Sequence, residues 1–345
     1  MKALTISAHG GFDQVHYRSD VAVPQLRSPT DVRVRMTAAA LNHLDVFMVG
    51  GLPGISITPP WILGADGTGF VESAGSAVSS VAAGDRVVIN GGIACRVCEY
   101  CRSGEQPLCV TFGLLGEHHP GTFAEMIVVP AANVRTVPVS VPDVQAAAFT
   151  LATLTAWRMV VSRAQVRAGE QVLIQGIGGG VAVAALQIAK ARGARVWVTS
   201  SSDEKLASAA ALGADETLNY TTTDVARAIR AATGKRGVDV VIDSVGAASW
   251  AHSLGALGKR GRLVTCGATT GPAVETDVRR MFWNQWTLMG STMGNDAEFD
   301  AIIAELAAGR LIPPVDSVFP LAEGRAAIER LAAKRHFGKI VLDLR

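Results

Sequence analysis

The stretch QVLIQGIGGGVAVAALQIAKARGARVWVTS, residues 171–200, sets the architecture of the chain. A short apolar run leads through a glycine cluster into a longer segment with helical spacing of apolar residues, and a second apolar run follows. This order predicts a strand, a glycine loop, a helix and a second strand. Similar strand and helix patterns continue as far as GRLVTCGA (261–268). We therefore predict an α/β region with a doubly wound parallel sheet covered by helices on both faces.

The glycine cluster predicts a loop that binds a dinucleotide. Gly176, Gly179 and Ala182 fit a small-x-x-Gly-x-x-small pattern between the predicted strand and helix. Glycines let the backbone approach a pyrophosphate, and the free N–H groups at the start of the helix meet its charge. A plain glycine turn between strand and helix is the alternative interpretation.

The end of the second strand indicates which dinucleotide is preferred. An acidic residue there would bind the hydroxyls of the adenosine ribose. The strand ends instead in Thr199, Ser200 and Ser201, and Lys205 follows one turn into the next helix. Hydroxyls and an ammonium group suit a phosphate, so we expect NADP(H) rather than NAD(H). The alternative is that Ser200 to Ser202 only cap the helix and that Lys205 is solvated.

Two domains are expected from the change of pattern along the chain. Up to about residue 137, short β-type runs such as VRVRMTAAA (32–40) are broken by Gly and Pro, which predicts a mostly antiparallel β domain. The final run IVLDL (340–344) has no sheet of its own nearby and should return to that domain. We thus predict one domain from residues 1–150 and 294–345 and an inserted domain at 151–293.

The composition restricts the classes of partner. The formal net charge is +2, with 18% charged and 49% hydrophobic residues, so no strong field attracts nucleic acid or a membrane surface. We expect small-molecule partners, no nucleic acid and no membrane. Neither a signal peptide nor a spanning segment is evident, so a cytoplasmic location is expected. In that reducing compartment clustered cysteines more often hold a metal than form disulfides.

Four of the five cysteines fall in a lobe at about residues 91–112. Their spacing is Cys95-x2-Cys98-x2-Cys101-x7-Cys109. Four thiolates can enclose one tetrahedral ion and leave no open position, so the site should be structural, with zinc as the expected metal. An iron–sulfur cluster and unmetallated thiols are the alternatives. The fifth cysteine, Cys266, is expected to be a buried small apolar residue.

The joint pattern resembles the medium-chain dehydrogenase/reductase superfamily, which includes zinc alcohol dehydrogenases and quinone oxidoreductases. The resemblance rests on the β domain with its four-cysteine lobe, the inserted dinucleotide domain, GTFAEMIVVP (121–130) and HFGKIVLDL (336–344). It implies a GroES-like β-barrel catalytic domain, a Rossmann domain and a cofactor in the cleft between them.

The resemblance also identifies three positions that hold a catalytic zinc in the alcohol dehydrogenases of this superfamily. These are a Cys, the His of a Gly-His-Glu segment, and a Cys or Asp before the first Rossmann helix. The corresponding residues here are Asn42, Gly64-Ala65-Asp66 and Leu151. Without an ion that has an open coordination position there is no Lewis acid. We therefore expect a zinc-independent reductase of the quinone oxidoreductase or enoyl reductase kind.

Further positions match those zinc-independent reductases. The pattern of that group includes Asn42 with Asp45, the turn Gly179-Gly180-Val181, and Lys205 with Tyr220 around the 2′-phosphate. The match of Lys205 and Tyr220 strengthens the NADPH interpretation.

One position departs from that group. Phe47 stands where a tyrosine is usual, so a phenol that might orient substrate or cofactor is missing. This leaves room for a dinucleotide-binding protein without turnover as an alternative function.

The expected reaction is hydride transfer from NADPH to an activated C=C bond or a quinone. The candidate catalytic residues are Asn42, His43, Asp45, Asp66 and Thr155. Asn42 and Thr155 would donate to the developing oxyanion, and His43 would relay a proton or be a packed polar side chain. For Asp45 we favour a buried carboxylate that ties down its own loop. A zinc alcohol dehydrogenase with zinc relocated to His43, Asp45 and Asp66 is the alternative enzyme.

Two further features complete the expectations. Ser244 and Gly267 end strands at the carboxyl edge of the predicted sheet, where the nicotinamide is expected. The segment QWTLMGSTMG (285–294) has the pattern of an edge strand that relatives pair across a dimer. We therefore expect a homodimer or homotetramer.

Overall fold

The computed structural model describes residues 1–345, which form two compact units. The first, which we call the terminal unit, comprises Met1–Leu151 and Asn295–Arg345. The second, the inserted unit, comprises Ala152–Gly294. The chain passes from one to the other within a single helix, α3 (Asp143–Trp157), which continues as a π-helix over Arg158–Arg163.

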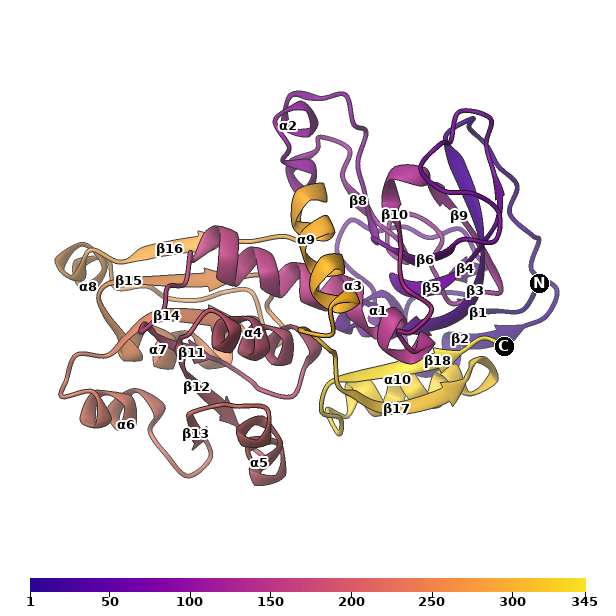
Figure 1. Cartoon of the computed structure of the whole chain (residues 1–345). Coiled ribbons are helices and arrows are strands. Elements are labelled where there is room, and N and C mark those ends of the chain that lie inside the picture. The colour runs from indigo at the N-terminus through magenta and orange to yellow at the C-terminus, as the bar shows by residue number, and fades with distance from the viewer. The chain divides into compact units, whose positions relative to one another are not determined.

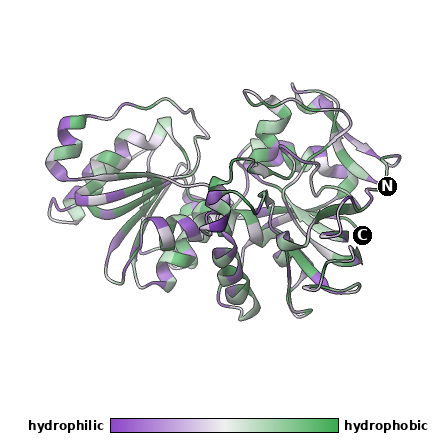
Figure 2. Cartoon of the chain, turned by 90° about the horizontal axis from the view of Figure 1, so that it is seen from above, coloured by the Kyte–Doolittle hydropathy of each residue, from purple (hydrophilic) through white to green (hydrophobic).

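The inserted unit is built on a six-stranded parallel sheet (Figure 1). The strand order β13-β12-β11-β14-β15-β16 is that of a Rossmann fold, which confirms the predicted class. The five residues after Arg195 in β12 are all buried, so both faces of that strand are covered. Figure 2 shows the strands of this sheet as mostly hydrophobic. The strands are β11 (Gln171–Ile174), β12 (Arg195–Ser200), β13 (Glu216–Asn219), β14 (Val238–Asp243), β15 (Leu257–Thr265) and β16 (Thr287–Gly290).

Five helices connect these strands. Three of them, α5, α6 and α8, begin at a Ser or Asp whose side chain accepts a backbone N–H of the first turn. The other two, α4 and α7, begin at glycine without a side-chain cap. The helices are α4 (Gly180–Ala191), α5 (Asp203–Ala211), α6 (Val225–Ala232), α7 (Ala247–Ala256) and α8 (Val278–Asn284).

The terminal unit is dominated by a seven-stranded, mostly antiparallel sheet. The last strand, β18, pairs with β3 and with β17, which confirms that the end of the chain returns to the first domain. The strands are β3 (Asp31–Ala40), β5 (Asp66–Ala74), β6 (Arg86–Ile89), β9 (Met126–Pro130), β10 (Val134–Thr136), β17 (Val315–Pro320) and β18 (Lys339–Asp343). Two small sheets contain β1 (Ala3–Ile6), β2 (Val15–Arg18) and β4 (Trp61–Ile62), and β7 (Gly92–Ile93) and β8 (Gly113–Leu114).

Helices complete the terminal unit around a core that contains the fully buried Phe123, Leu63 and Met48. Besides the first part of α3, the helices are α1 (His43–Gly50), α2 (Glu99–Arg102), α9 (Asp296–Ala307) and α10 (Gly324–Ala332). Short 3-10 turns lie at Phe12–Gln14, Gln106–Leu108, Ala131–Asn133 and Leu321–Glu323. The barrel-like sheet places the ends of β3, β5 and β18 next to one another, because β3 pairs with both others.

The helical run Asp143–Arg163 is long and apolar enough to cross a membrane. In this structure 72% of its apolar window is buried inside the protein. A core helix passes the same test of length and composition, so the run is weak support for a membrane span.

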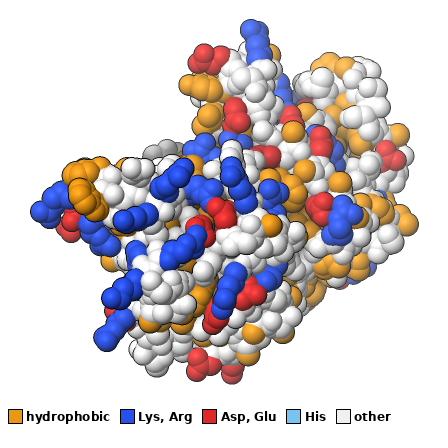
Figure 3. Space-filling view, turned by 60° about the vertical axis from the view of Figure 1, so that its left-hand side comes forward, with side chains coloured by type: hydrophobic (Ala, Val, Ile, Leu, Met, Phe, Trp, Pro, Cys, Tyr) orange, Lys and Arg blue, Asp and Glu red, His pale blue; other side chains and the backbone are white.

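Charge is divided unequally between the two units. The inserted unit carries 16 Lys and Arg against 10 Asp and Glu, whereas the whole chain carries 32 against 30. Figure 3 shows Lys and Arg side chains spread over the face that is turned toward the viewer, with fewer acidic ones among them. The inserted unit is therefore the cationic part of a nearly neutral chain, which suits a polyanionic ligand such as a dinucleotide.

Candidate functional site

A triangle of buried polar side chains joins the ends of β3, β5 and β18. Asp66 is fully buried, and its Oδ2 accepts hydrogen bonds from Lys339 Nζ at 2.8 Å and from Asn42 Nδ2 at 2.9 Å. Lys339 Nζ also donates to Asn42 Oδ1 at 2.6 Å. The Lys339–Asn42–Asp66 triangle therefore fixes which way the Asn42 amide faces.

The second oxygen of Asp66 is bound from α3. Its Oδ1 accepts the Thr150 hydroxyl and the Leu151 N–H, the latter at 2.6 Å. The carboxylate thus has four donors, one of them an ammonium group that is itself 4% exposed. A buried ion pair is tolerated when its remaining hydrogen-bonding capacity is satisfied in this way.

Asp45 is a second buried carboxylate, but it binds backbone rather than a cation. Its Oδ2 accepts the Asn42 N–H at 2.7 Å and its Oδ1 accepts the Gly64 N–H at 3.1 Å. It therefore ties the loop before α1 to the loop before β5. Burial raises the pKa of Asp45 to about 7; the neighbouring Asp66 adds to the rise, while the two backbone donors and Lys339 oppose it.

Gly64 is required for this arrangement. Its φ is +97°, and a Cβ there would lie 2.3 Å from the Phe123 ring. Only glycine can deliver its N–H to Asp45 from this position.

His43 and Thr155 have contacts of their own outside the triangle. The half-buried His43 ring packs edge-on against Phe47, with centroids 5.0 Å apart. Burial lowers the pKa of His43 and Lys334 lowers it further, so the imidazole is neutral at pH 7. Thr155 belongs to the inserted unit, where its hydroxyl lies 3.7 Å from Met293 Sδ. The structure therefore brings Asn42, Asp45 and Asp66 together, with His43 on the same helix turn as Asp45.

The predicted glycine loop connects β11 to α4 in the inserted unit. Gly179 is the N-cap of α4, no side chain caps this helix, and the space where a side chain would stand is open. Gly176 has φ +68°, and a Cβ there would lie 2.8 Å from Val245. Gly180 and Val181 form the first turn of α4, with N–H groups that have no partner within the helix. These features fit a pyrophosphate at the helix start.

The residues predicted for the adenosine end also lie together. The Tyr220 N–H donates to the Ser200 carbonyl at 3.1 Å, and the Tyr220 side chain is 50% exposed. Ser201 is exposed at the end of β12. Ser202 caps α5 by accepting the Lys205 N–H at 3.3 Å, so this serine has the capping role that was one of the two interpretations. The ends of β12 and β13 thus present hydroxyls and the lysine of the first turn of α5 on one edge.

Ser244 and Gly267 are neighbours at the same carboxyl edge. A Cβ on Gly267 would lie 3.2 Å from the Ser244 carbonyl oxygen. The adjacent Cys266 is half-buried, and burial raises the pKa of its thiol to about 12. It follows the last residue of β15, where the chain leaves the sheet and exposes more of its side chains.

The four clustered cysteines form a site that fits one metal ion. The Sγ atoms of Cys95, Cys98, Cys101 and Cys109 all lie within 4.8 Å of one another. Cys109 Sγ accepts the N–H groups of Cys95 at 3.2 Å and of Thr111 at 3.4 Å. Burial alone would raise the pKa of Cys109, but these donors and the Thr111 hydroxyl lower it to about 6. Four sulfur donors with one already biased to thiolate match a closed tetrahedral zinc site.

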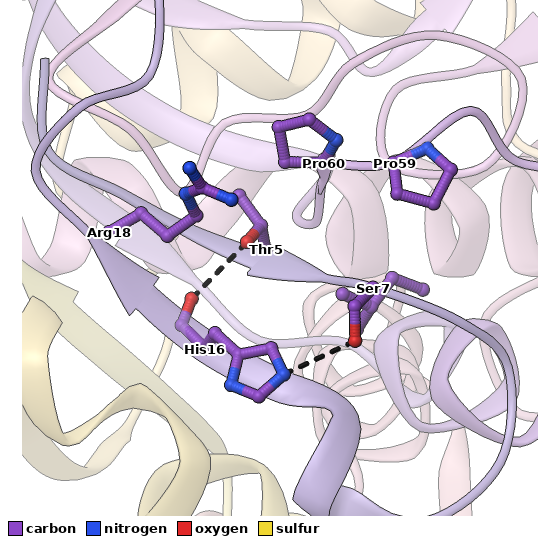
Figure 4. A pocket seen from close by; sticks show the side chains of 7 residues that line it. Thr5, Ser7, His16, Arg18, Pro59 and Pro60 are labelled. Atoms are coloured by element: carbon purple, nitrogen blue, oxygen red, sulfur yellow. Dashed lines mark hydrogen bonds between the residues drawn. The ribbon is translucent and has the colours of Figure 1, made fainter.

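A separate pocket of about 460 Å³ lies in the terminal unit (Figure 4). His16 Nε2 and the Ser7 hydroxyl share a hydrogen bond of 3.2 Å, and the His16 carbonyl accepts the Thr5 hydroxyl at 3.4 Å. No residue predicted for catalysis or cofactor binding lines this pocket, whose walls are Thr5, Ile6, Ser7, His16, Arg18, Pro59 and Pro60.

Sequence comparison identifies the family. Residues 28–139 match the family described as the alcohol dehydrogenase GroES-like domain, and residues 180–308 match the zinc-binding dehydrogenase family. A zinc-type alcohol dehydrogenase-like protein of Schizosaccharomyces pombe is 32% identical over 97% of this chain and 96% of its own. The chain belongs to the medium-chain dehydrogenase/reductase superfamily. It is therefore an oxidoreductase with a GroES-like domain and a Rossmann domain.

Other relatives within the superfamily carry different activities. A quinone oxidoreductase of Pseudomonas aeruginosa is 31% identical over 99% of both chains, and a 2-haloacrylate reductase of a Burkholderia species is 30% identical over 91% of both. Among solved structures, an NAD-dependent alcohol dehydrogenase is 42% identical, covers 100% of both chains and has a TM-score of 0.95.

Asn42, Ala65 and Leu151 stand at the positions that the resemblance assigns to catalytic zinc ligands. Asn42 lies in the triangle with Lys339 and Asp66, Ala65 is buried, and the Leu151 side chain packs against the core of the terminal unit. At these three positions the side chains are thus a carboxamide, a methyl group and an isobutyl group. Both nearby side-chain oxygens, Asn42 Oδ1 and Asp66 Oδ2, already accept from the Lys339 ammonium.

Nothing in the sequence pattern singled out Lys339 or Thr150. The one available sign was a lysine at the start of the apolar strand KIVLD, where a buried charge needs a partner. Thr150 lies in the middle of an apolar helix and has no distinguishing pattern.

Proposed function

We propose that this chain is an NADPH-dependent oxidoreductase that transfers hydride to an activated C=C bond or a quinone without a catalytic zinc. The observation that carries the proposal is the Lys339–Asn42–Asp66 triangle, in which Asn42 occupies one of the three positions that the resemblance assigns to catalytic zinc ligands. The Lys339 ammonium supplies the positive charge there and bonds to the oxygens that a cation would need. The names of two relatives, quinone oxidoreductase and 2-haloacrylate reductase, support this substrate class.

The proposed roles of the terminal unit follow from how its side chains are held. Asn42 donates one amide hydrogen to Asp66, and its second reaches only the Ala40 carbonyl at 3.5 Å. Because this second bond is long, we propose that the hydrogen would be offered to a developing enolate oxygen, the role that was also predicted for the Thr155 hydroxyl. The neutral His43 relays a proton, and Asp45 and Asp66 position Asn42.

The cofactor proposal rests on the edge of the inserted unit. When bound, the nicotinamide supplies the hydride. Lys205, Ser200, Ser201 and Tyr220 hold the 2′-phosphate, since no acid ends β12. Gly176, Gly179, Gly180 and Val181 would hold the pyrophosphate, and Ser244 and Gly267 would face the nicotinamide.

A substrate panel tests the reaction. Oxidation of NADPH followed at 340 nm should be fast with an α,β-unsaturated ketone, a 2-haloacrylate or 1,4-benzoquinone. Oxidation of primary and secondary alcohols with NADP+ or NAD+ should be slow. Efficient alcohol oxidation with no reduction of the enones and quinones would support the alcohol dehydrogenase alternative. Tight NADPH binding with no turnover on any of these would support a non-catalytic protein.

One structural zinc in the four-cysteine lobe and a cytoplasmic location complete the biochemical proposal. The cluster fits zinc, and thiolates persist as metal ligands in a reducing compartment. NADPH-dependent reduction suits the same compartment.

We also propose a homodimer or homotetramer through the free edge of β16. This strand ends the six-stranded sheet, and the preceding helix α8 exposes Phe282 by 64% and Trp283 by 76%. An unpaired strand edge beside exposed aromatic side chains favours association. Light scattering should give at least a dimer mass for the wild type and a smaller mass for Trp283→Asp. A wild-type monomer would contradict the proposal.

A further inference from the structure

In the inserted unit, a continuous chain of buried hydrogen bonds joins the glycine loop after β11 to the loop after β14, residues 244–246. Both loops lie at the carboxyl edge of the parallel sheet. The Gly176 N–H donates to Thr199 Oγ1 at 3.1 Å, and the Thr199 hydroxyl donates to Gln175 Oε1 at 2.7 Å. Gln175 Nε2 donates to Ser253 Oγ at 3.0 Å, and the Ser253 hydroxyl donates to Asp243 Oδ2 at 2.8 Å. The four side chains are each less than 5% exposed.

The far end of this chain holds the loop after β14. Asp243 Oδ1 accepts the N–H groups of Val245 at 2.8 Å and Gly246 at 3.1 Å. Ser249 donates its hydroxyl to the same carboxylate at 2.7 Å but has no bond to Gln175. No cation pairs with Asp243, so its position depends on these donors.

The orientation of the Gln175 amide is fixed by its neighbours. If the amide were flipped, its oxygen would face Ser253, whose hydroxyl would then turn to Gln175 and leave Asp243. Asp243 would lose a donor in a site that water does not reach, which is costly. The hydrogen bonds therefore all point in one direction, from Gly176 to Asp243, and loss of any member interrupts the hydrogen-bonded connection between the two loops.

The two loops also touch directly and have little room to move. A Cβ at Gly176 would lie 2.8 Å from Val245, and a Cβ at Gly246, where φ is +88°, would lie 2.7 Å from the Gly271 carbonyl. Polar networks that are fully satisfied in a buried site hold their members rigidly. A ligand that restricts Gly176 therefore also restricts Thr199, Gln175 and the rest of the chain.

We infer that Gln175 and Ser253 are positioning residues for the dinucleotide, because they couple phosphate binding at the glycine loop to the order of residues 244–246. This rests on the cofactor site proposed above. Binding of the adenosine and phosphate half at one loop then prepares the other loop for the nicotinamide half. Binding of the adenosine and phosphate half orders residues 244–246 in advance. Binding of the nicotinamide half then costs less conformational entropy.

The test uses 2′,5′-ADP, which carries the adenosine and phosphate groups but no nicotinamide. Hydrogen exchange of the Val245 and Gly246 amides reports directly on their bonds to Asp243. In the wild-type enzyme, 2′,5′-ADP should slow exchange of these amides roughly threefold or more. Ser253→Ala should abolish this protection while calorimetry still shows 2′,5′-ADP binding within about twofold of wild type.

Ser249→Ala is the matched control. Both serines donate to Asp243 from α7, but only Ser253 is bonded to Gln175. Ser249→Ala should keep the protection by 2′,5′-ADP. In steady-state assays with NADPH, Ser253→Ala should lower kcat severalfold with little change in KM, because it affects placement of the nicotinamide rather than affinity at the phosphates.

The outcomes separate the two proposals. Protection in Ser253→Ala equal to that in the wild type, or no protection in a wild type that binds 2′,5′-ADP, would overturn the coupling. If Ser253→Ala does not fold, Gln175→Met breaks the same chain from the other side and takes its place. Failure of the wild type to bind 2′,5′-ADP would contradict the proposed cofactor. It would also contradict the coupling, which depends on that cofactor.

Discussion

The two buried carboxylates beside Asn42 differ in how the protein stabilises them. Asp66 has four donors that include the Lys339 ammonium, whereas Asp45 has two backbone N–H groups and no cation in contact. The first is therefore held as an ion pair, whereas burial raises the pKa of the second to about 7, so that it changes its protonation state near neutral pH. Each makes a separate prediction.

Removal of Lys339 should strongly destabilise the terminal unit. Lys339→Met leaves Asp66 buried without its cation, and breaking a buried pair typically costs about 3–5 kcal/mol of the free energy of unfolding. Guanidinium denaturation of this variant, of Asp66→Asn and of the double variant gives a double-mutant cycle. The double variant should lose less than the sum of the two single variants. Additive losses would show that the two side chains do not interact.

Ionisation of Asp45 should make the free energy of unfolding fall as pH rises. Its pKa is higher in the folded protein than the ordinary 3.8, so the folded state binds the proton more tightly. The stabilisation is complete below about pH 4 and is lost as pH rises through 7. Between pH 5 and pH 8 the free energy of unfolding should fall by about 2–3 kcal/mol from this group. Asp45→Asn should remove that part of the slope, whereas the exposed Asp13→Asn should not; an unchanged slope in Asp45→Asn would contradict the assignment.

Lys205 should determine the choice of cofactor. Lys205→Glu puts a carboxylate beside the proposed 2′-phosphate, so the Kd for NADPH should rise roughly tenfold or more, about 1.4 kcal/mol, and the Kd for NADH much less. Lys259→Glu makes the same charge change at an exposed site near the start of β15 and should alter neither by much. Equal weakening of both cofactors by Lys205→Glu would refute the NADPH preference.

The sequence predicted the residues with a recognisable spacing better than those that act through three-dimensional contacts. Asn42 and Asp45 could be located from their spacing, and a tie within its own loop was the favoured interpretation of Asp45. The partnership of Asn42 with Lys339 joins residues 297 positions apart, so no local pattern reveals it. The roles of Gln175 and Ser253 were not predicted for the same reason.

The four-cysteine lobe holds the start of α9 as well as its expected metal. Arg96 of the lobe forms an ion pair with Asp296, and Gln106 Oε1 accepts the Asp296 N–H at 3.4 Å. Asp296 opens α9 just after the chain re-enters the terminal unit at Asn295. The lobe therefore contributes to the anchoring of that helix, in keeping with a structural rather than catalytic metal.

Loss of one ligand should unfold the lobe and leave the chemical step intact. Cys98→Ser should lose zinc, lower Tm by several degrees and speed hydrogen exchange in residues 295–300. The folded fraction should keep kcat within about twofold of wild type. Cys266→Ser, which removes a cysteine outside the cluster, should retain its zinc. A fully stable Cys98→Ser variant without hydride transfer would contradict a structural role.

Strands and helices with strong patterns were predicted well, whereas irregular segments were not. The π-helix over Arg158–Arg163, for example, has no clear signature in the sequence. Likewise β18 was expected from its apolar run, and its partners β3 and β17 became known only from the sheet. Pairing partners depend on long-range packing, which the pattern of one segment does not contain.

The molecule as a whole combines a GroES-like unit with an inserted Rossmann unit in one chain. The predicted boundaries after residues 150 and 293 differ by one residue each from the observed boundaries after Leu151 and Gly294. The inserted unit carries the excess of positive charge, and the terminal unit carries the buried triangle and the metal lobe. Under the proposed function, dinucleotide binding falls to the inserted unit and activation of the acceptor to the terminal unit.

The most direct test of hydride transfer without a catalytic zinc is to measure zinc content and turnover on the same preparation. Mass spectrometry should find about one zinc ion per chain, held by the four cysteines, in enzyme that oxidises NADPH with an enone. Added 1,10-phenanthroline should leave the initial rate of that oxidation unchanged. Two zinc ions per chain, with turnover that is lost on chelation and restored by zinc while the protein stays folded, would contradict it.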